Sequence, residues 1–116
     1  GWAPAVTPGV ATKELRKDPG NGAETCLVLI EAGASVPWEY SSTLREGYLA
    51  TGNYHHSECV NGKVLTWVYT RGGYFYRPPD VINGGPLSRA ETDSVWFMRE
   101  TDGGTHDLQP GCEPIS

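Results

Sequence analysis

The sequence lacks the features that would mark several common functional classes. No apolar run approaches the ~20 residues of a transmembrane helix. Basic residues are scattered, and 9 Lys and Arg against 14 Asp and Glu give a net charge of −5. No basic stripe is therefore present to follow a phosphate backbone, and we expect neither nucleic acid nor a membrane as a partner. No signal peptide is visible. A start at Gly1 is compatible with a processed terminus, a tag remnant or a domain excised from a longer protein.

Cysteine is scarce, and the three cysteines cannot all pair within one molecule. Cys26 lies in an apolar run and is expected to be a buried thiol, whereas Cys59 and Cys112 lie in loop-like contexts. We expect all three to be reduced, which favours the cytoplasm.

Glycine, proline and aromatic residues are plentiful by contrast. The 116 residues include 15 Gly, 9 Pro, 6 Tyr, 4 Trp and 2 Phe, and β-branched and aromatic residues dominate the apolar runs. Such a composition favours short strands with many turns over long helices. The length fits one domain. We therefore predict an all-β fold, a small antiparallel β-barrel or jelly roll.

The apolar runs and turn signals divide the chain. Residues 1–22 are expected to form an N-terminal arm, 23–100 the barrel, and 101–116 a polar C-terminal tail. Asn61-Gly62 predicts a tight hairpin turn, and residues 83–86 predict another turn. Alternation and residue type predict strands at 24–30, 46–54, 64–70, 74–77 and 95–99.

Several stretches occur in a suggestive order: Leu27-Val28, Gly-Ala-Ser-Val-Pro at 33–37, Tyr-Leu-Ala-Thr-Gly at 48–52, and Gly-Tyr-Phe-Tyr-Arg-Pro-Pro at 73–79. In this order they resemble the opening, the end of the first motif and the start of the second motif of cupins similar to the ChrR-type anti-sigma-factor domain. The resemblance covers roughly residues 2–100. It implies a barrel with a site at its centre.

The metal ligands of that family are replaced. Glu39 and Ser41 take the places of the first two histidines, Glu46 that of the glutamate, and Asn83 that of the third histidine. The spacing from Glu46 to Gly52 is one residue shorter than the commonest spacing from the motif glutamate to its closing glycine. Carboxylate, hydroxyl and amide oxygens suit Fe, Mn, Ni or Zn far less than imidazoles do. We therefore expect no transition metal and no cofactor, and the family's metal chemistry does not carry over.

The replaced positions still predict a polar site inside the barrel. If both Glu39 and Glu46 face inward, they repel, one pKa rises, and the pair is suited to acid–base catalysis. The alternative places one or both at the rim, solvated or paired with Arg45 or Arg77. The predicted ligand-binding residues around the pair are Ser41, Tyr48, Tyr76, Asn83 and Trp96.

Two adjacent histidines are the remaining candidates for a metal ligand. His55 and His56 would face opposite sides of a strand, so only one can enter the pocket. The plainer interpretation is that both histidines lie in a loop or on an edge strand and bind no metal.

Two functions remain open. The first is a small-molecule-binding cupin without a catalytic metal, with acid–base chemistry from Glu39 and Glu46 as a variant. The alternative is a regulatory or interaction module that presents a barrel face to a protein partner. Exposed strand edges need protection, and two-fold pairing is common, so we expect a homodimer with contacts from residues 2–15.

Overall fold

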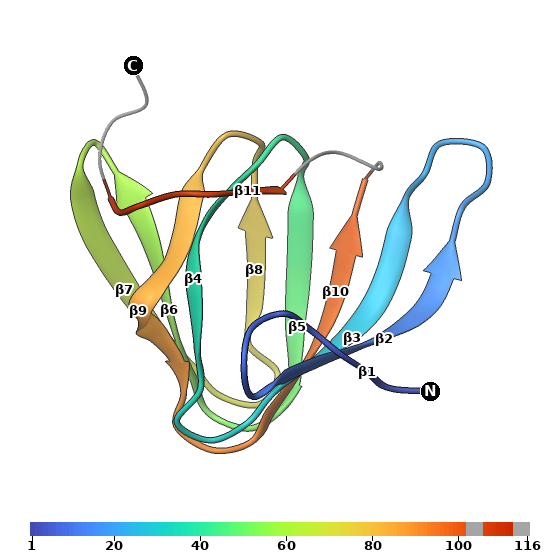
Figure 1. Cartoon of the computed structure of the whole chain (residues 1–116), viewed down its shortest axis with the longest axis horizontal. Coiled ribbons are helices and arrows are strands. Elements are labelled where there is room, and N and C mark those ends of the chain that lie inside the picture. Colours follow the sequence, from blue (N-terminus) through green and yellow to red (C-terminus); the bar gives the residue numbers. More distant parts are fainter. Residues whose placement is uncertain (102–105, 113–116) are drawn as a thin grey trace.

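Two antiparallel β-sheets face each other in the computed structural model, which describes residues 1–101 and 106–112 (Figure 1). The six-stranded sheet has the order β1 (Ala3–Pro4), β2 (Val10–Lys17), β3 (Glu24–Ile30), β10 (Ser94–Glu100), β5 (Arg45–Thr51) and β8 (Tyr74–Arg77). The five-stranded sheet has the order β11 (His106–Leu108), β4 (Ser35–Ser41), β9 (Ile82–Ala90), β6 (Tyr54–Val60) and β7 (Lys63–Tyr69). The all-β antiparallel prediction is confirmed. Nothing in the described ranges forms a helix of the length and apolarity that crossing a membrane requires.

The strand predictions succeeded where the apolar runs were clear. The predicted strands at 24–30 and 74–77 match β3 and β8. The predicted strand at 46–54 is divided, because the chain turns at Gly52, which has a φ of 103°, and Tyr54 begins β6. The hairpin at Asn61-Gly62 is confirmed: both residues have positive φ, 52° and 76°, between the paired strands β6 and β7.

The turn predicted at residues 83–86 is wrong, because this segment lies inside β9. Gly84 and Gly85 have positive φ, and the register between β4 and β9 shifts between Val36 and Glu39. A Cβ on Gly84 would lie 2.2 Å from the carbonyl oxygen of Pro37. The two glycines therefore form a bulge that lets β9 pass close to β4 without reversing the chain.

The expected arm and tail both contribute strands. Residues 1–22 supply β1 and β2, and β2 pairs along β3. In the tail, β11 pairs with β4, so that Leu108 lies opposite Glu39. Figure 1 shows β11 crossing the view in front of β4, the strand with which it pairs. Residues 102–105 and 113–116 of the expected tail lie outside the described residues.

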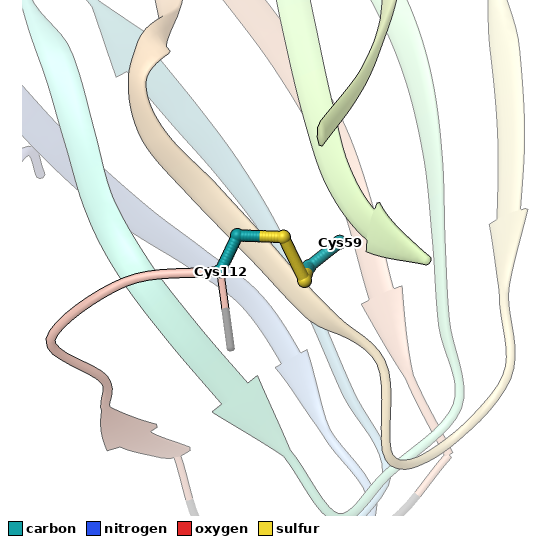
Figure 2. The surroundings of a disulfide bond; sticks show 2 residues. All are labelled: Cys59 and Cys112. Carbon is teal, nitrogen blue, oxygen red and sulfur yellow. A yellow bond between two sulfur atoms is a disulfide. The ribbon is translucent and has the colours of Figure 1, made fainter. Parts of the chain in front are cut away.

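The expectation that all cysteines are reduced is wrong. Cys59, near the end of β6, is joined to Cys112 by a disulfide bond (Figure 2), and Cys26 is a free thiol. The pairing of β11 with β4 returns the chain to the five-stranded sheet, and this brings two residues separated by 53 positions together. The cysteine argument for the cytoplasm therefore loses its support.

The core lies between the sheets and is rich in aromatic rings. The six-stranded sheet contributes Ile30, Leu49, Phe75, Trp96 and Met98, and β6 contributes Tyr54 from the opposite side. The ring of Trp96 makes edge contacts with Tyr54, Tyr69 and Phe75, at centroid distances of 5.5, 5.5 and 5.3 Å. The rings of Tyr54, Phe75 and Trp96 also line a cavity between the sheets.

Candidate functional site

A cavity of about 430 Å³ lies between the two sheets. Ligand-binding pockets in proteins are usually mostly apolar, with a few polar groups, and have about 300–1,000 Å³ of volume. Apolar side chains from both sheets, such as Val28, Val36 and Met98, make up most of this wall. The larger polar side chains among the lining residues are Glu39, Arg45, Tyr54, His56, Arg77 and Asn83.

The alternation of side chains along β8 determines which of its residues reach the cavity. Phe75 and Arg77 are buried and line it, whereas Tyr74 and Tyr76 are exposed on the outer face of the sheet. Gly47 on the neighbouring strand β5 makes room for the inner side chain, because a Cβ there would lie 2.1 Å from the Phe75 ring. The tyrosines therefore belong to a different surface from the cavity.

Three of the predicted site residues do lie at the cavity: Glu39, Asn83 and Trp96. Glu39 and Asn83 are register partners on β4 and β9, and Asn83 Nδ2 donates a hydrogen bond of 3.3 Å to the Glu39 carbonyl oxygen. Ser41 is fully buried and shares a hydrogen bond of 3.0 Å with the hydroxyl of Thr43. Ser41 is not among the lining residues.

The predicted positions of Glu46, Tyr48 and Tyr76 inside the barrel are wrong. All three lie on the outer face, where Tyr48 is 48% and Tyr76 is 59% exposed. The hydroxyl of Tyr74 donates a hydrogen bond to the Glu46 carboxylate there. A shift of one residue moves a side chain to the other face of a strand, so Glu46, which is one residue closer to Gly52 than the commonest spacing, lies outside. Glu39 and Glu46 consequently lie on opposite sides of the sheet wall and form no catalytic pair.

Arg45 takes the inner position that the motif alignment had given to Glu46. Its Nη1 lies 3.9 Å from Oε1 of Glu39, and its Nε lies 2.9 Å from Oε1 of Glu100. This is the arrangement that the alternative interpretation allowed, with Glu39 paired to an arginine. The cavity thus contains an ion-paired guanidinium at the inner end of β5.

Arg77 is the other cavity arginine, and it is only 2% exposed. Its Cζ lies 5.5 Å from the centroid of the Phe75 ring, a cation–π contact within β8. Burial, together with the like charge of Arg45, lowers the pKa of Arg77 from its usual range to about 10. The group therefore remains charged at neutral pH. Sequence reasoning had considered Arg77 only as a partner for a carboxylate.

The two adjacent histidines face opposite sides of β6, as predicted. His55 lies 3.4 Å from Glu91 at the surface. His56 is buried at the cavity and stacks on Phe75, with centroids 5.3 Å apart and planes 14° apart. Burial lowers the pKa of His56, although Glu58, whose Oε2 is 3.6 Å from Nε2, partly offsets this. The plainer interpretation of a loop or edge histidine is wrong for His56, because β6 lies between β9 and β7.

These residues do not fit the metal that the cupin resemblance implies. Within residues 1–101 and 106–112, no three His, Cys, Asp or Glu side chains gather as a metal-binding group. Glu39 and Asn83 are oxygen donors, and Arg45 places a positive charge beside Glu39. A guanidinium at this distance opposes the binding of a divalent cation at Glu39.

Comparison with known proteins places this geometry in a known fold. No family model and no curated protein matches the sequence. An RmlC-like cupin from Shewanella frigidimarina is similar in structure, with a TM-score of 0.72 and 16% identity over 85% of this chain and 81% of the other. A putative acetylacetone dioxygenase from Methylibium petroleiphilum has a TM-score of 0.72 and 20% identity over 100% and 80% of the two chains.

A third similar structure is the cupin domain of Cnp3 from Schizosaccharomyces pombe. It has a TM-score of 0.66 and 14% identity, over 88% of this chain and 69% of the other. Sequence identities this low show a shared fold and nothing further. The order of the strands, the two facing sheets and these similarities together show that this chain has the cupin jelly-roll fold.

Proposed function

We propose that this protein binds a small organic molecule between its two sheets without the help of a transition metal. The supporting observation is the cavity of about 430 Å³ with its apolar wall and buried polar groups. A barrel that served only as a scaffold would fill this space with side chains. The structural similarities support the cupin fold but not the ChrR type. The resemblance to ChrR-type domains is therefore a proposal.

Binding is favoured over acid–base catalysis. The proposed catalytic pair required Glu39 and Glu46 in one pocket, but Glu46 lies on the outer face. Glu39 lies near Arg45, with its Oε1 3.9 Å from Nη1 of the arginine. No second carboxylate among the cavity-lining residues is available to share its proton.

The test uses an uncharged fluorescent probe, N-phenyl-1-naphthylamine, whose emission rises in apolar surroundings. We expect saturable binding by the native protein and at least tenfold weaker binding by Val28→Phe, which fills the cavity. Leu29→Phe, one residue along β3 and outside the cavity lining, is the matched control and should bind as the native protein does. Equal binding by both variants would contradict the proposal.

An interaction module is the second candidate function. The outer face of β8, β5 and β10 carries exposed aromatic side chains, namely Tyr48, Tyr74, Tyr76 and Phe97. An apolar patch of this kind often marks a contact surface. We expect substitution of Tyr74 and Phe97 by serine to leave probe binding unchanged, so that the two candidate functions are separable.

A homodimer remains our proposal for the assembly. The edge strand β7 exposes Leu65 and Trp67, and an unprotected edge favours pairing with another chain. Light scattering at high micromolar concentration should give twice the mass of one chain. A monomer under these conditions would contradict the proposal.

The disulfide between Cys59 and Cys112 bears on location. Disulfide bonds persist mainly in oxidising compartments. We therefore propose an oxidising compartment in place of the cytoplasm. Alkylation of thiols in the native source, followed by mass spectrometry, should label Cys26 alone.

A further inference from the structure

The buried guanidinium of Arg77 is attracted by Glu39, Glu58 and Glu100 only from beyond ion-pair distance. Among the described residues, its Nη2 atom is buried and has no hydrogen-bond partner, and no carboxylate forms an ion pair with it. Arg45 differs, because Glu39 and Glu100 lie beside it. An unpaired buried charge is costly, and buried charges in proteins are normally paired.

Two further buried nitrogens at the same cavity form no hydrogen bond in the described part of the chain. One is Nε1 of Trp96; the other, Nε2 of His56, has Oε2 of Glu58 3.6 Å away. Both rings contact Phe75, which lies under Arg77. The indole N–H only donates, and the guanidinium only donates. Donors without hydrogen-bond partners on Arg77 and Trp96 thus lie at one cavity, which suits a group that accepts several hydrogen bonds.

We propose that the cavity binds an apolar monocarboxylic acid whose carboxylate pairs with Arg77. This inference rests on the proposed function and names the class of ligand. A carboxylate accepts hydrogen bonds at both oxygens and matches the guanidinium in charge and shape. The hydrocarbon part of the acid would contact the apolar wall formed by Val28, Ile30, Val36, Phe75 and Met98.

The charges around the site limit how much negative charge a ligand can carry. The lining residues include two arginines and one glutamate. Glu58 lies beside His56 and Glu100 beside Arg45, so the wider surroundings carry no excess of positive charge. A phosphate or phosphate ester carries about two negative charges at neutral pH, and it would be repelled more strongly than a carboxylate.

The test compares acids with their uncharged amides by isothermal titration calorimetry at neutral pH. The probes are benzoate, phenylacetate and octanoate, each beside its amide, with inorganic phosphate as the competing anion. We expect at least one acid to bind at least tenfold more tightly than its amide, and phosphate not to bind. Equal binding of acid and amide, tighter binding of phosphate, or no binding of any acid would overturn the inference.

Substituting Arg77, with Arg71 as a control, shows which positive charge binds the acid. Arg77→Met should weaken binding of the acid at least tenfold and leave binding of its amide within about twofold. Arg71→Met is the matched control, because Arg71 is exposed in the turn before β8, and it should bind the acid as the native protein does. Undiminished acid binding by Arg77→Met would overturn the inference. The comparison of acid with amide in the native protein stands even where Arg77→Met does not fold.

The uncharged fluorescent probe separates this inference from the proposed function. If N-phenyl-1-naphthylamine binds in the cavity and the acids show no preference over the amides, the cavity is a binding site and the carboxylate assignment is wrong. If neither the probe nor any acid binds, both proposals fail.

Discussion

Glu39 on β4 and Arg45 on β5 meet between the two sheets, with Oε1 of the glutamate 3.9 Å from Nη1 of the arginine. In the resemblance to cupins drawn from the sequence, Glu39 takes the place of the first motif histidine. Arg45, one residue before Glu46, has the commonest spacing to Gly52 for the motif glutamate. On that alignment, an ion pair takes the place of two metal ligands.

This ion pair predicts that the protein does not retain a transition metal. Protein purified without chelator should contain far less than one equivalent of Fe, Mn, Ni or Zn by elemental analysis, because a guanidinium opposes a divalent cation at Glu39. Added Mn²⁺ or Zn²⁺ should leave the melting temperature unchanged. Stoichiometric metal that EDTA removes, with a fall in melting temperature, would show that the ion pair rearranges to admit a cation.

The buried His56 predicts a loss of stability at mildly acidic pH. Its pKa is lowered in the folded protein from the usual 6.5 by burial, while Glu58 acts in the opposite direction and the nearby Arg77 and Arg45 lower it further. Below about pH 6.5 the unfolded chain therefore binds a proton that the folded chain does not, and the free energy of unfolding falls. The loss amounts to about 1.4 kcal/mol per unit of lowering. The loss stops growing once the pH falls below the pKa of His56 in the folded protein.

Urea unfolding at pH 7 and pH 5 measures this effect. His56→Gln should reduce the difference in stability between the two pH values. His55→Gln, on the exposed face of the same strand, should retain it. Equal pH dependence in the two variants would assign the effect to other groups.

The disulfide predicts a large stability difference between oxidised and reduced protein. Cys59 and Cys112 are separated by 53 positions, and closing a loop of this size stabilises the fold by roughly 4 kcal/mol through the unfolded chain. The urea midpoint should fall on reduction. Cys26→Ala should keep the full response to reductant, whereas Cys59→Ala/Cys112→Ala should have none. A midpoint unchanged by complete reduction would contradict this account.

The bulge in β9 predicts a sharp difference between two glycines. Gly84→Ala places a Cβ 2.2 Å from the Pro37 carbonyl oxygen at a φ of 100°, so β4 and β9 must move apart. Gly33→Ala has a similar positive φ of 84° and open space around the Cβ. The control should lose only the ~1–2 kcal/mol of a left-handed residue. Gly84→Ala should lose clearly more in urea unfolding, and equal losses would refute the packing argument.

The sequence predicted the class of fold and several strands because these depend on local pattern. The run at 24–30 and the Asn61-Gly62 turn form as expected. The bulge at Gly84-Gly85 was mistaken for a turn, because positive φ serves both and only the pairing of β9 with β4 distinguishes them. The disulfide could not be deduced, because the pairing of β11 that brings Cys112 to Cys59 is a long-range contact.

The candidate site was predicted in part. Glu39, Asn83 and Trp96 were placed correctly, since each lies on an inner strand position. A shift of one residue assigned Glu46 and Tyr48 to the wrong face of β5. Tyr76 was misplaced with them, because β8 is the neighbour of β5 and shares its outer face. The signal that would have found Arg77 was present in β8: an inward Phe75 requires an inward Arg77 two residues later.

The alternation along β8 gives the protein two surfaces that can change separately. Tyr74 and Tyr76 belong to the exterior, and Phe75 and Arg77 to the cavity, within four consecutive residues. A substitution at an even-numbered position of this strand alters what the outside presents and spares the interior, and an odd-numbered one does the reverse. The lining of the cavity and the outer face of the sheet can thus change independently, by natural selection or by design.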